Sequence, residues 1–284
     1  MRRTSATLQR NKMGKFDGVL ICTDLDGTLL RNDKSISCEN LEAIDYFCAG
    51  GGAFTIVTGR MPFFNTEICD IVKLKTPFGC INGGGVYDYS TKRYLWTQEI
   101  DRACLDLAEH VERTLPHIGI QINTFDRIYF CKENKTMEYF RHITHVENLV
   151  CGVRDVHEPL AKIVFGIDDG DSVDELIDVL NAHPLSGEFD FIRTEKHLYE
   201  IMPKGVNKGT SVSKICEHLG LDVGRSIAIG DYNNDIPMLR AAGVGIAVAN
   251  ACEDALAAAD FITVSNEEHA IARVIHDLEN GKYF

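Results

Sequence analysis

VLICTDLDGT, residues 19–28, is the stretch that decides the fold of this chain. Its first four residues are apolar and partly β-branched, which predicts a buried strand of a parallel sheet. The strand ends at Asp24, Asp26 and Gly27, and open α/β sheets bind ligands at the carboxyl ends of their strands. Two carboxylates this close repel each other and lose hydration, so the pattern indicates a bound cation or a shared proton. The simpler interpretation is a turn that ends the strand, because Asp and Gly are common turn residues.

Composition is typical of a soluble globular protein with one large domain or two modest ones. The chain has 284 residues, 45% of them hydrophobic, and a mean hydropathy of −0.09. A net charge of −13 argues against nucleic acid or anionic membranes as partners, and it means that an anionic substrate needs local positive charge. Ten cysteines without a CxxC pair predict reduced thiols in a cytoplasmic protein. No apolar run approaches the roughly 18 residues of a transmembrane helix.

The first fifteen residues differ from the rest of the chain. Residues 1–15 carry five basic side chains and no acidic one. They contain neither an apolar segment nor a clear amphipathic stripe, so a targeting peptide is disfavoured. We expect a disordered N-terminal extension.

Strands and helices alternate on either side of a central segment of different character. Buried strands predicted at 54–57 and 226–229, with helices between, indicate βαβ units and a parallel sheet. We therefore expect residues 16–85 and 204–284 to form a Rossmann-like α/β core. Residues 86–203 mix strand pairs with helices, which predicts an inserted α+β cap domain over the strand ends. Its hinges are expected near the glycines at 83–85 and near residues 203–205.

Polar groups able to handle a phosphate follow three of the predicted parallel strands. They are Asp24 and Asp26, then Thr58 and Gly59, and finally the segment GDYNND at residues 230–235. Because parallel strands present their carboxyl ends at one edge, these groups are expected to share a cavity, which Lys208 at the start of a helix can reach. Carboxylates suit Mg²⁺, and no His/Cys cluster has zinc spacing. Taken singly, each motif also fits a turn, a solvated lysine or a helix cap.

Together, these motifs resemble those of the haloacid dehalogenase-like phosphatases. The matching segments, in order, are DLDGT at 24–28, TGR at 58–60, Lys208, and GD and ND within 230–235. NGG at 82–84, EIMPKGVNKG at 200–209 and VANA at 248–251 are similar to the Cof-type subgroup with its large α/β cap (type IIB). The resemblance covers residues 17–280. The chain departs from it at His269-Ala270, where the family usually has Gly-Val, and in a compact cap.

The resemblance implies a role for each matching residue. Asp24 would be the nucleophile that forms an aspartyl-phosphate, and Asp26 the acid that protonates the leaving alcohol and then the base that activates water. Mg²⁺ would be held by Asp24, the backbone carbonyl of Asp26 and Asp231, with Asp235 orienting ligand waters. Lys208 would add a fixed positive charge.

Other matching residues would bind the phosphate itself. Its oxygens would accept hydrogen bonds from the Thr58 hydroxyl, the backbone N–H groups of Leu25 and Gly59, and the Asn234 amide. Arg60 is left open between an ion pair with the acidic site and a place on the following helix. The aromatic residues of the cap, such as Tyr139 and Phe140, have no informative spacing and are expected to be packing or surface groups.

The expected function is a Mg²⁺-dependent phosphatase of small phosphorylated metabolites, such as sugar phosphates, in the cytoplasm. A carboxylate at position 26 favours a phosphatase or phosphomutase over a dehalogenase or P-type pump, which have no alcohol leaving group to protonate. A phosphomutase or phosphotransferase of the same superfamily therefore stays open, as does a non-enzymatic phosphate-binding sensor. The sequence specifies neither the substrate, nor the cap residues that contact it, nor the oligomeric state.

Overall fold

The computed structural model describes residues 14–147 and 149–284. The extension predicted for residues 1–15 therefore lies almost entirely outside the described residues. None of the described helices combines the length and the apolar character that crossing a bilayer would require.

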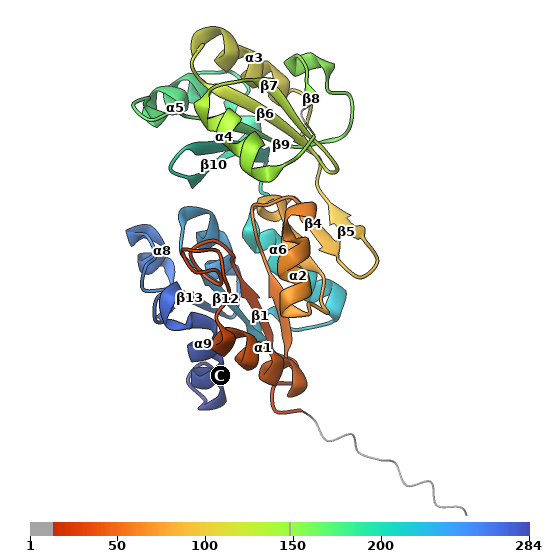
Figure 1. Ribbon diagram of the computed structural model, residues 1–284, viewed down its shortest axis with the longest axis vertical. Helices are drawn as coiled ribbons and strands as arrows, with labels where there is room; N and C mark the ends of the chain where they lie inside the picture. The colour runs from red at the N-terminus through yellow and green to blue at the C-terminus, as the bar shows by residue number, and fades with distance from the viewer. Residues whose placement is uncertain (1–13, 148) are drawn as a thin grey trace, which may run out of the picture.

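A five-stranded parallel sheet forms one layer of the molecule, in the lower half of Figure 1. Its order is β14 (Phe261–Ile262), β13 (Val244–Ala247), β12 (Ser226–Gly230), β1 (Leu20–Thr23) and β2 (Ala53–Ile56). All neighbouring strands pair in parallel, so the predicted α/β class with a parallel sheet is confirmed.

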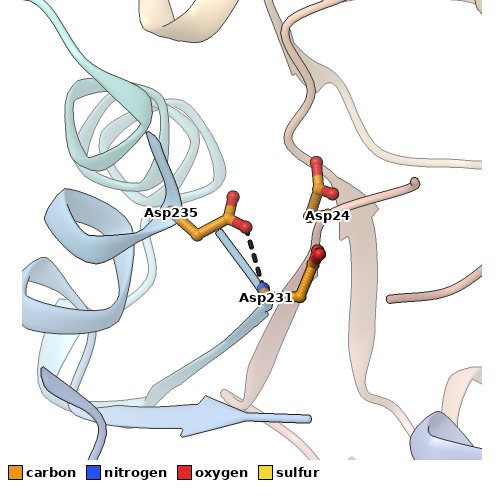
Figure 2. Close-up of side chains that lie close together, drawn as sticks. All are labelled: Asp24, Asp231 and Asp235. Atoms are coloured by element: carbon orange, nitrogen blue, oxygen red, sulfur yellow. Dashed lines mark hydrogen bonds between the residues drawn. The ribbon is translucent and has the colours of Figure 1, made fainter. Parts of the chain in front are cut away.

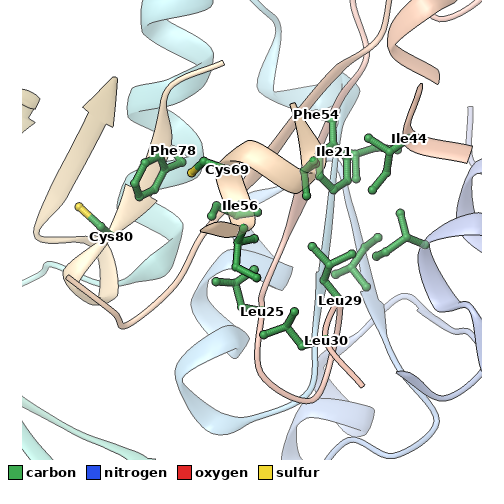
Figure 3. Packing of buried hydrophobic residues seen from close by; sticks show 14 of the residues in the cluster. Ile21, Leu25, Leu29, Leu30, Ile44, Phe54, Ile56, Cys69, Phe78 and Cys80 are labelled. Carbon is green, nitrogen blue, oxygen red and sulfur yellow. The ribbon is translucent and has the colours of Figure 1, made fainter. Parts of the chain in front are cut away.

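Helices bury both faces of this sheet. Ile21 of β1 packs in a cluster with residues of α1 (Cys38–Ala49) and α9 (Ala270–Glu279), part of which is drawn in Figure 3. Leu20 and Cys22 belong to a second cluster, with residues of α6 (Lys208–Leu219) and α7 (Ile236–Ala241). Because successive side chains of a strand point to opposite faces and both faces are covered, β1 is buried at every position and apolar from Leu20 to Cys22. The remaining helices of this half are α2 (Thr66–Val72) and α8 (Glu253–Ala258).

A small antiparallel sheet extends this half beyond β2. It consists of β3 (Phe78–Cys80), β4 (Gly85–Asp88) and β5 (Arg93–Thr97), and Val57 forms a parallel bridge with Gly79 of β3. The chain reverses after β3 through Ile81 and Asn82, whose φ angles are 55° and 50°. The boundary predicted between residues 85 and 86 falls inside this sheet, since β4 and β5 pair with β3. A hairpin of this kind has the same sequence pattern as the strand pairs expected further on.

A six-stranded sheet forms the upper half of Figure 1. Its order is β10 (Phe189–Glu195), β11 (Leu198–Pro203), β9 (Leu160–Gly166), β6 (Gly119–Thr124), β7 (Ile128–Lys132) and β8 (Leu149–Val150). Ile120 and Ile122 pack on one face, in a cluster with α3 (Cys104–Thr114) and α5 (Val173–Asn181). Gln121 and Asn123, which alternate with them, line a cavity on the other face, as does α4 (Lys135–Thr144).

The chain passes between the two halves twice. Gln98 N–H donates to Gly84 in the lower half, whereas Ile100 N–H donates to Leu160 in the upper half, so the first crossing lies between them. Gly205 N–H donates to Asp190 of β10, and α6 begins at Lys208, which places the second crossing between these residues. The second agrees with the expected hinge region, and the first lies after β5 instead of at residues 83–85.

Candidate active site

Three carboxylates converge at the carboxyl edge of the parallel sheet (Figure 2). Asp24 follows β1 and Asp231 follows β12, and these strands are direct neighbours. Asp235 lies in the short turn before α7 and is fully buried. One oxygen of each carboxylate lies within 4.8 Å of the others. The predicted juxtaposition of these three residues is therefore present in the structure.

Lys208 neutralises part of this charge. Its side chain is buried at the start of α6, and its Nζ donates to Asp24 Oδ1 at 2.6 Å and to Asp235 Oδ1 at 2.5 Å. Burial alone would lower the pKa of Lys208, but Asp235 and Asp24 raise it overall, so the ammonium is charged.

One ammonium does not balance three carboxylates. Burial raises the pKa of Asp24 well above its ordinary range, against the attraction of Lys208. Burial and the charge of Asp235 raise the pKa of Asp231 to about 7. Both shifts mean that the cluster holds more negative charge than its surroundings stabilise. An all-oxygen donor set with excess negative charge fits a hard divalent cation such as Mg²⁺.

The remaining contacts fix the positions of Asp231 and Asp235. Thr28 Oγ1 donates to Asp231 Oδ1 at 2.7 Å, and Asp235 Oδ2 accepts from the N–H groups of Asp231 and Tyr232 at 2.9 and 3.0 Å. Gly27 has a φ of +81°, and a Cβ there would lie 2.5 Å from Asp231 Oδ2. Glycine is thus required both by the backbone conformation and by the approach of the carboxylate.

The residues expected to bind phosphate line the same cavity. Thr58, Gly59 and Asn234 face it together with Asp24 and Lys208. A Cβ on Gly59 would lie 2.8 Å from the side chain of Asn82, so the loop needs glycine at this point. Leu25 is fully buried and does not line the cavity, so its predicted contact with the phosphate would have to come from its backbone N–H alone.

Asp26 is held by two cations. Arg60 donates to it through Nε at 2.9 Å and Nη2 at 2.7 Å, and Lys34 Nζ donates at 2.8 Å. Burial would raise the pKa of Asp26, but these hydrogen bonds outweigh it and hold the pKa below its ordinary value. The structure thus places Arg60 in an ion pair with the site. Sequence reasoning missed Lys34, for which no local pattern gives a signal.

A buried polar chain connects the six-stranded sheet to the phosphate-binding residues, and sequence reasoning missed it too. Lys162 of β9 donates to Glu200 of β11 at 2.7 Å and to the carbonyl of Gly59 at 3.2 Å. Asn82 Nδ2 donates to Glu200 at 2.8 Å, and its Oδ1 accepts from Asn234 at 3.1 Å. A lysine inside the apolar run LAKIVFG, residues 160–166, was the available signal, because lysine is seldom buried unpaired.

The two halves of the molecule enclose the cavity between them. It has a volume of about 1130 Å³, larger than a phosphate group needs. The lower half contributes Asp24 and Asp231 of the acidic cluster, Asp26, Arg60 and residues of α2. The upper half contributes side chains of β6, β9, β10, β11 and α4. A ligand whose phosphate lies at Asp24 would therefore contact both halves.

Fold and site together define a class of enzyme. The haloacid dehalogenase-like hydrolase family matches residues 21–275, so the chain belongs to this family, and within it to the Cof-type phosphatases. A Bacillus subtilis protein named 5-amino-6-(5-phospho-D-ribitylamino)uracil phosphatase is 28% identical, over 93% of this chain and 99% of its own length. The phosphoglycolate phosphatase of Methanopyrus kandleri is 26% identical, over 91% of this chain and 96% of its own length.

Solved structures show the same fold. A haloacid dehalogenase-like hydrolase from Bacteroides thetaiotaomicron superposes with a TM-score of 0.77 at 26% identity, covering 93% of this chain and 99% of that one. A sugar phosphatase of HAD subclass IIB superposes with a TM-score of 0.80 at 22% identity, covering 92% and 98%. The family resemblance inferred from the sequence motifs is thus confirmed.

Proposed function

We propose that this enzyme is a Mg²⁺-dependent phosphatase that hydrolyses small phosphorylated metabolites through an aspartyl-phosphate on Asp24. The observation that carries the proposal is the buried Asp24 carboxylate, held by Lys208 beside Asp231 and Asp235 at the edge of the cavity. A site that only bound phosphate would gain nothing from a carboxylate at its centre, because the two anions repel each other.

The acidic cluster would hold the metal ion. Asp24, Asp231 and the backbone carbonyl of Asp26 would be its protein ligands, and Asp235 would lie close enough to orient bound water. When bound, Mg²⁺ would neutralise charge on the phosphoryl oxygens and on the attacking carboxylate.

In the first step, an oxygen of Asp24 attacks phosphorus and the bond from phosphorus to the ester oxygen breaks. The hydroxyl of Thr58, the N–H groups of Leu25 and Gly59, the amide of Asn234 and the ammonium of Lys208 donate to the phosphoryl oxygens. Donors fixed in place by the fold stabilise the charge of the transition state without rearrangement.

Asp26 would handle the proton in both steps. It gives a proton to the leaving alkoxide, then takes one from the water that attacks phosphorus and releases Asp24 and inorganic phosphate. Its ion pairs with Arg60 and Lys34 keep it deprotonated in this arrangement. The acid role therefore requires that the carboxyl group leave these cations when substrate binds.

The six-stranded sheet would act as a cap over this site. We propose a core of residues 16–85 and 204–284, to which β4 and β5 also belong because they pair with β3, and an inserted cap formed by the rest of 86–203. Movement about the two crossings would admit substrate and then exclude bulk water.

Phosphate release from a panel of phosphomonoesters tests the function. We expect Mg²⁺ to support turnover, EDTA to abolish it, and Asp24→Asn to reduce kcat roughly 10⁴- to 10⁶-fold without unfolding the protein. Asp45→Asn, which changes an exposed carboxylate on α1, is the matched control. Full activity after rigorous chelation would contradict the metal proposal. Phosphoryl transfer to a second sugar hydroxyl without phosphate release would indicate a mutase, and ligand binding without turnover a sensor.

A further inference from the structure

Two helices contribute large apolar side chains to the cavity, one from each half of the molecule. α4 of the upper half contributes Tyr139, Phe140 and Ile143, and α2 of the lower half contributes Ile68 and Ile71. Tyr139 is 60% exposed, Ile143 46% and Ile71 42%. Apolar side chains that stay exposed inside a cavity, and not scattered over the surface, indicate a ligand or partner that covers them.

Polar side chains line the same cavity from β6 and β10. Gln121 and Asn123 reach it because Ile120 and Ile122, which alternate with them, are buried on the other face of the sheet. Gln121 Nε2 donates to Asn123 Oδ1 at 2.7 Å, which aligns the two amides side by side. Thr194 of β10 adds a hydroxyl. Amides and hydroxyls both donate and accept hydrogen bonds, so they can pair with the heteroatoms of a ring edge.

We propose that the organic part of the substrate contains a planar heteroaromatic ring that packs against Tyr139, Phe140 and Ile143 of α4. This inference rests on the proposed phosphatase function. Such a ring has apolar faces, which aromatic side chains cover by stacking or edge contact, and polar edge atoms, which the amides of β6 can bind. A sugar phosphate alone carries hydroxyls around most of its surface and would leave the apolar side chains of α4 uncovered.

The positive charge of Lys208 places the phosphate at the end of the ligand opposite the ring. Lys208 and the acidic cluster lie on the lower half, whereas α4 lies on the upper half, and both line one cavity of about 1130 Å³. This volume exceeds the roughly 300–1,000 Å³ of pockets for drug-sized ligands, so it has room for a phosphate, a linker and a ring. The alternative is that α4 and α2 only contact each other when the cap closes. In that case the loss of an apolar side chain would affect all substrates alike.

Steady-state kinetics with two sets of esters separate these explanations. The ring-bearing esters are riboflavin 5′-phosphate and pyridoxal 5′-phosphate, and the ring-free esters are ribose 5-phosphate and glucose 6-phosphate. We expect a higher kcat/KM for at least one ring-bearing ester than for either sugar phosphate. Tyr139→Ala is expected to lower kcat/KM for that ester about 10- to 100-fold, mainly through KM, and for ribose 5-phosphate by a much smaller factor.

Two further variants control the result. Tyr139→Phe is expected to restore most of the preference, because it keeps the aromatic face. Val150→Ala, at a 63% exposed position of the upper half that does not line the cavity, is expected to behave as wild type. Sugar phosphates turned over faster than both ring-bearing esters, or an equal loss on all substrates in Tyr139→Ala, would overturn the inference. Absence of turnover with every ester would instead contradict the proposed function itself.

Discussion

At the residue scale, Asp26 has to meet two opposite requirements. As an acid it needs a proton, yet Arg60 and Lys34 hold it as a carboxylate. Arg60 and Lys34 both line the cavity, so an incoming phosphate can attract them. A dianion that draws these cations away from Asp26 would free its carboxyl group for proton transfer only when substrate is present.

Substitution of Asp26 tests its acid role through the leaving group. Asp26→Asn is expected to lower kcat about 10²- to 10⁴-fold for an alkyl phosphate, whose alkoxide must be protonated. The loss is expected to be much smaller for p-nitrophenyl phosphate, because nitrophenolate leaves as a stable anion. Rates of phosphate release from the two esters give the comparison. Equal losses would contradict the role of Asp26 as an acid.

Gly27 offers a second test at the residue scale. In Gly27→Ala the new methyl group would displace the carboxylate of Asp231, whose Oδ2 lies 2.5 Å from the position of the added Cβ. We expect the Mg²⁺ concentration for half-maximal activity to rise and the free energy of unfolding to fall by about 1–3 kcal/mol.

Gly281→Ala is the matched control for Gly27→Ala. Gly281 has a similar φ of +73°, but nothing lies within 4 Å of an added Cβ. This variant should show only backbone strain, about 1 kcal/mol, and an unchanged Mg²⁺ dependence. If both variants had the wild-type Mg²⁺ dependence, the contact with Asp231 would not matter for the site.

At the scale of elements, Lys162 of β9 and Glu200 of β11 form a buried ion pair. Lys162 is 5% exposed and Glu200 2%. Removing one member of such a pair leaves a buried charge without a partner, whereas exposed pairs contribute little. The same pair contacts Gly59 and Asn82, so it also holds the phosphate-binding loop.

Breaking this pair is expected to cost stability and activity together. Glu200→Gln should lower the free energy of unfolding by about 3–5 kcal/mol and reduce kcat/KM. Asp169→Asn, which removes an ion pair with Lys196 whose side chains are 81% and 74% exposed, should cost less than about 1 kcal/mol. Urea unfolding measures both. If both variants lost only a similarly small free energy of unfolding, the buried pair would contribute no more to stability than the exposed one.

The elements themselves could be predicted where a local pattern specifies them. Ser37, a residue type that favours the first position before a helix, caps α1 by accepting from Asn40 N–H at 3.2 Å, and the alternation of Ile120 and Ile122 with polar residues is the local pattern of β6. The two-residue β8 and the short α8 were not predicted, because so few residues show no period. The place of β4 and β5 in the lower half depends on contacts distant in sequence, such as the cluster that joins Val86 to Val212 of α6, which no local pattern contains.

The same distinction applies to the candidate site. Asp24, Asp231 and Lys208 could be placed together because parallel strands bring their ends to one edge. The ion pair of Lys34 with Asp26 and the chain from Lys162 to Asn82 could not, since each joins side chains from separate elements through tertiary packing. Tyr139 and Phe140 were expected to be packing or surface groups, and the role proposed for them rests on their place in the cavity.

At the scale of the whole molecule, the two halves contribute different parts of one function. The chain carries a net charge of −13, yet basic side chains line the cavity from both halves, which supplies the local positive charge that an anionic substrate needs. These basic residues are Lys34, Arg60, Lys162, Lys196 and Lys208. Separation of the halves would remove two of them from the site.

The only tryptophan of the chain lies where its fluorescence can report movement of the halves. Trp96 lies on β5, just before the first crossing, and Lys214 of α6 lies over its indole ring, 5.8 Å from the centroid. α6 is the helix that carries Lys208, so the ring lies between the phosphate-binding helix and the start of the first crossing. We expect a saturable change in tryptophan emission when Mg²⁺ and inorganic phosphate are added, and none in Trp96→Phe. Unchanged emission while calorimetry records phosphate binding would mean that the surroundings of Trp96 do not respond to ligand binding, which would contradict this prediction. If the change occurs, the enzyme reports its own closure without an attached dye, and stopped-flow fluorescence could then time cap movement within a single turnover.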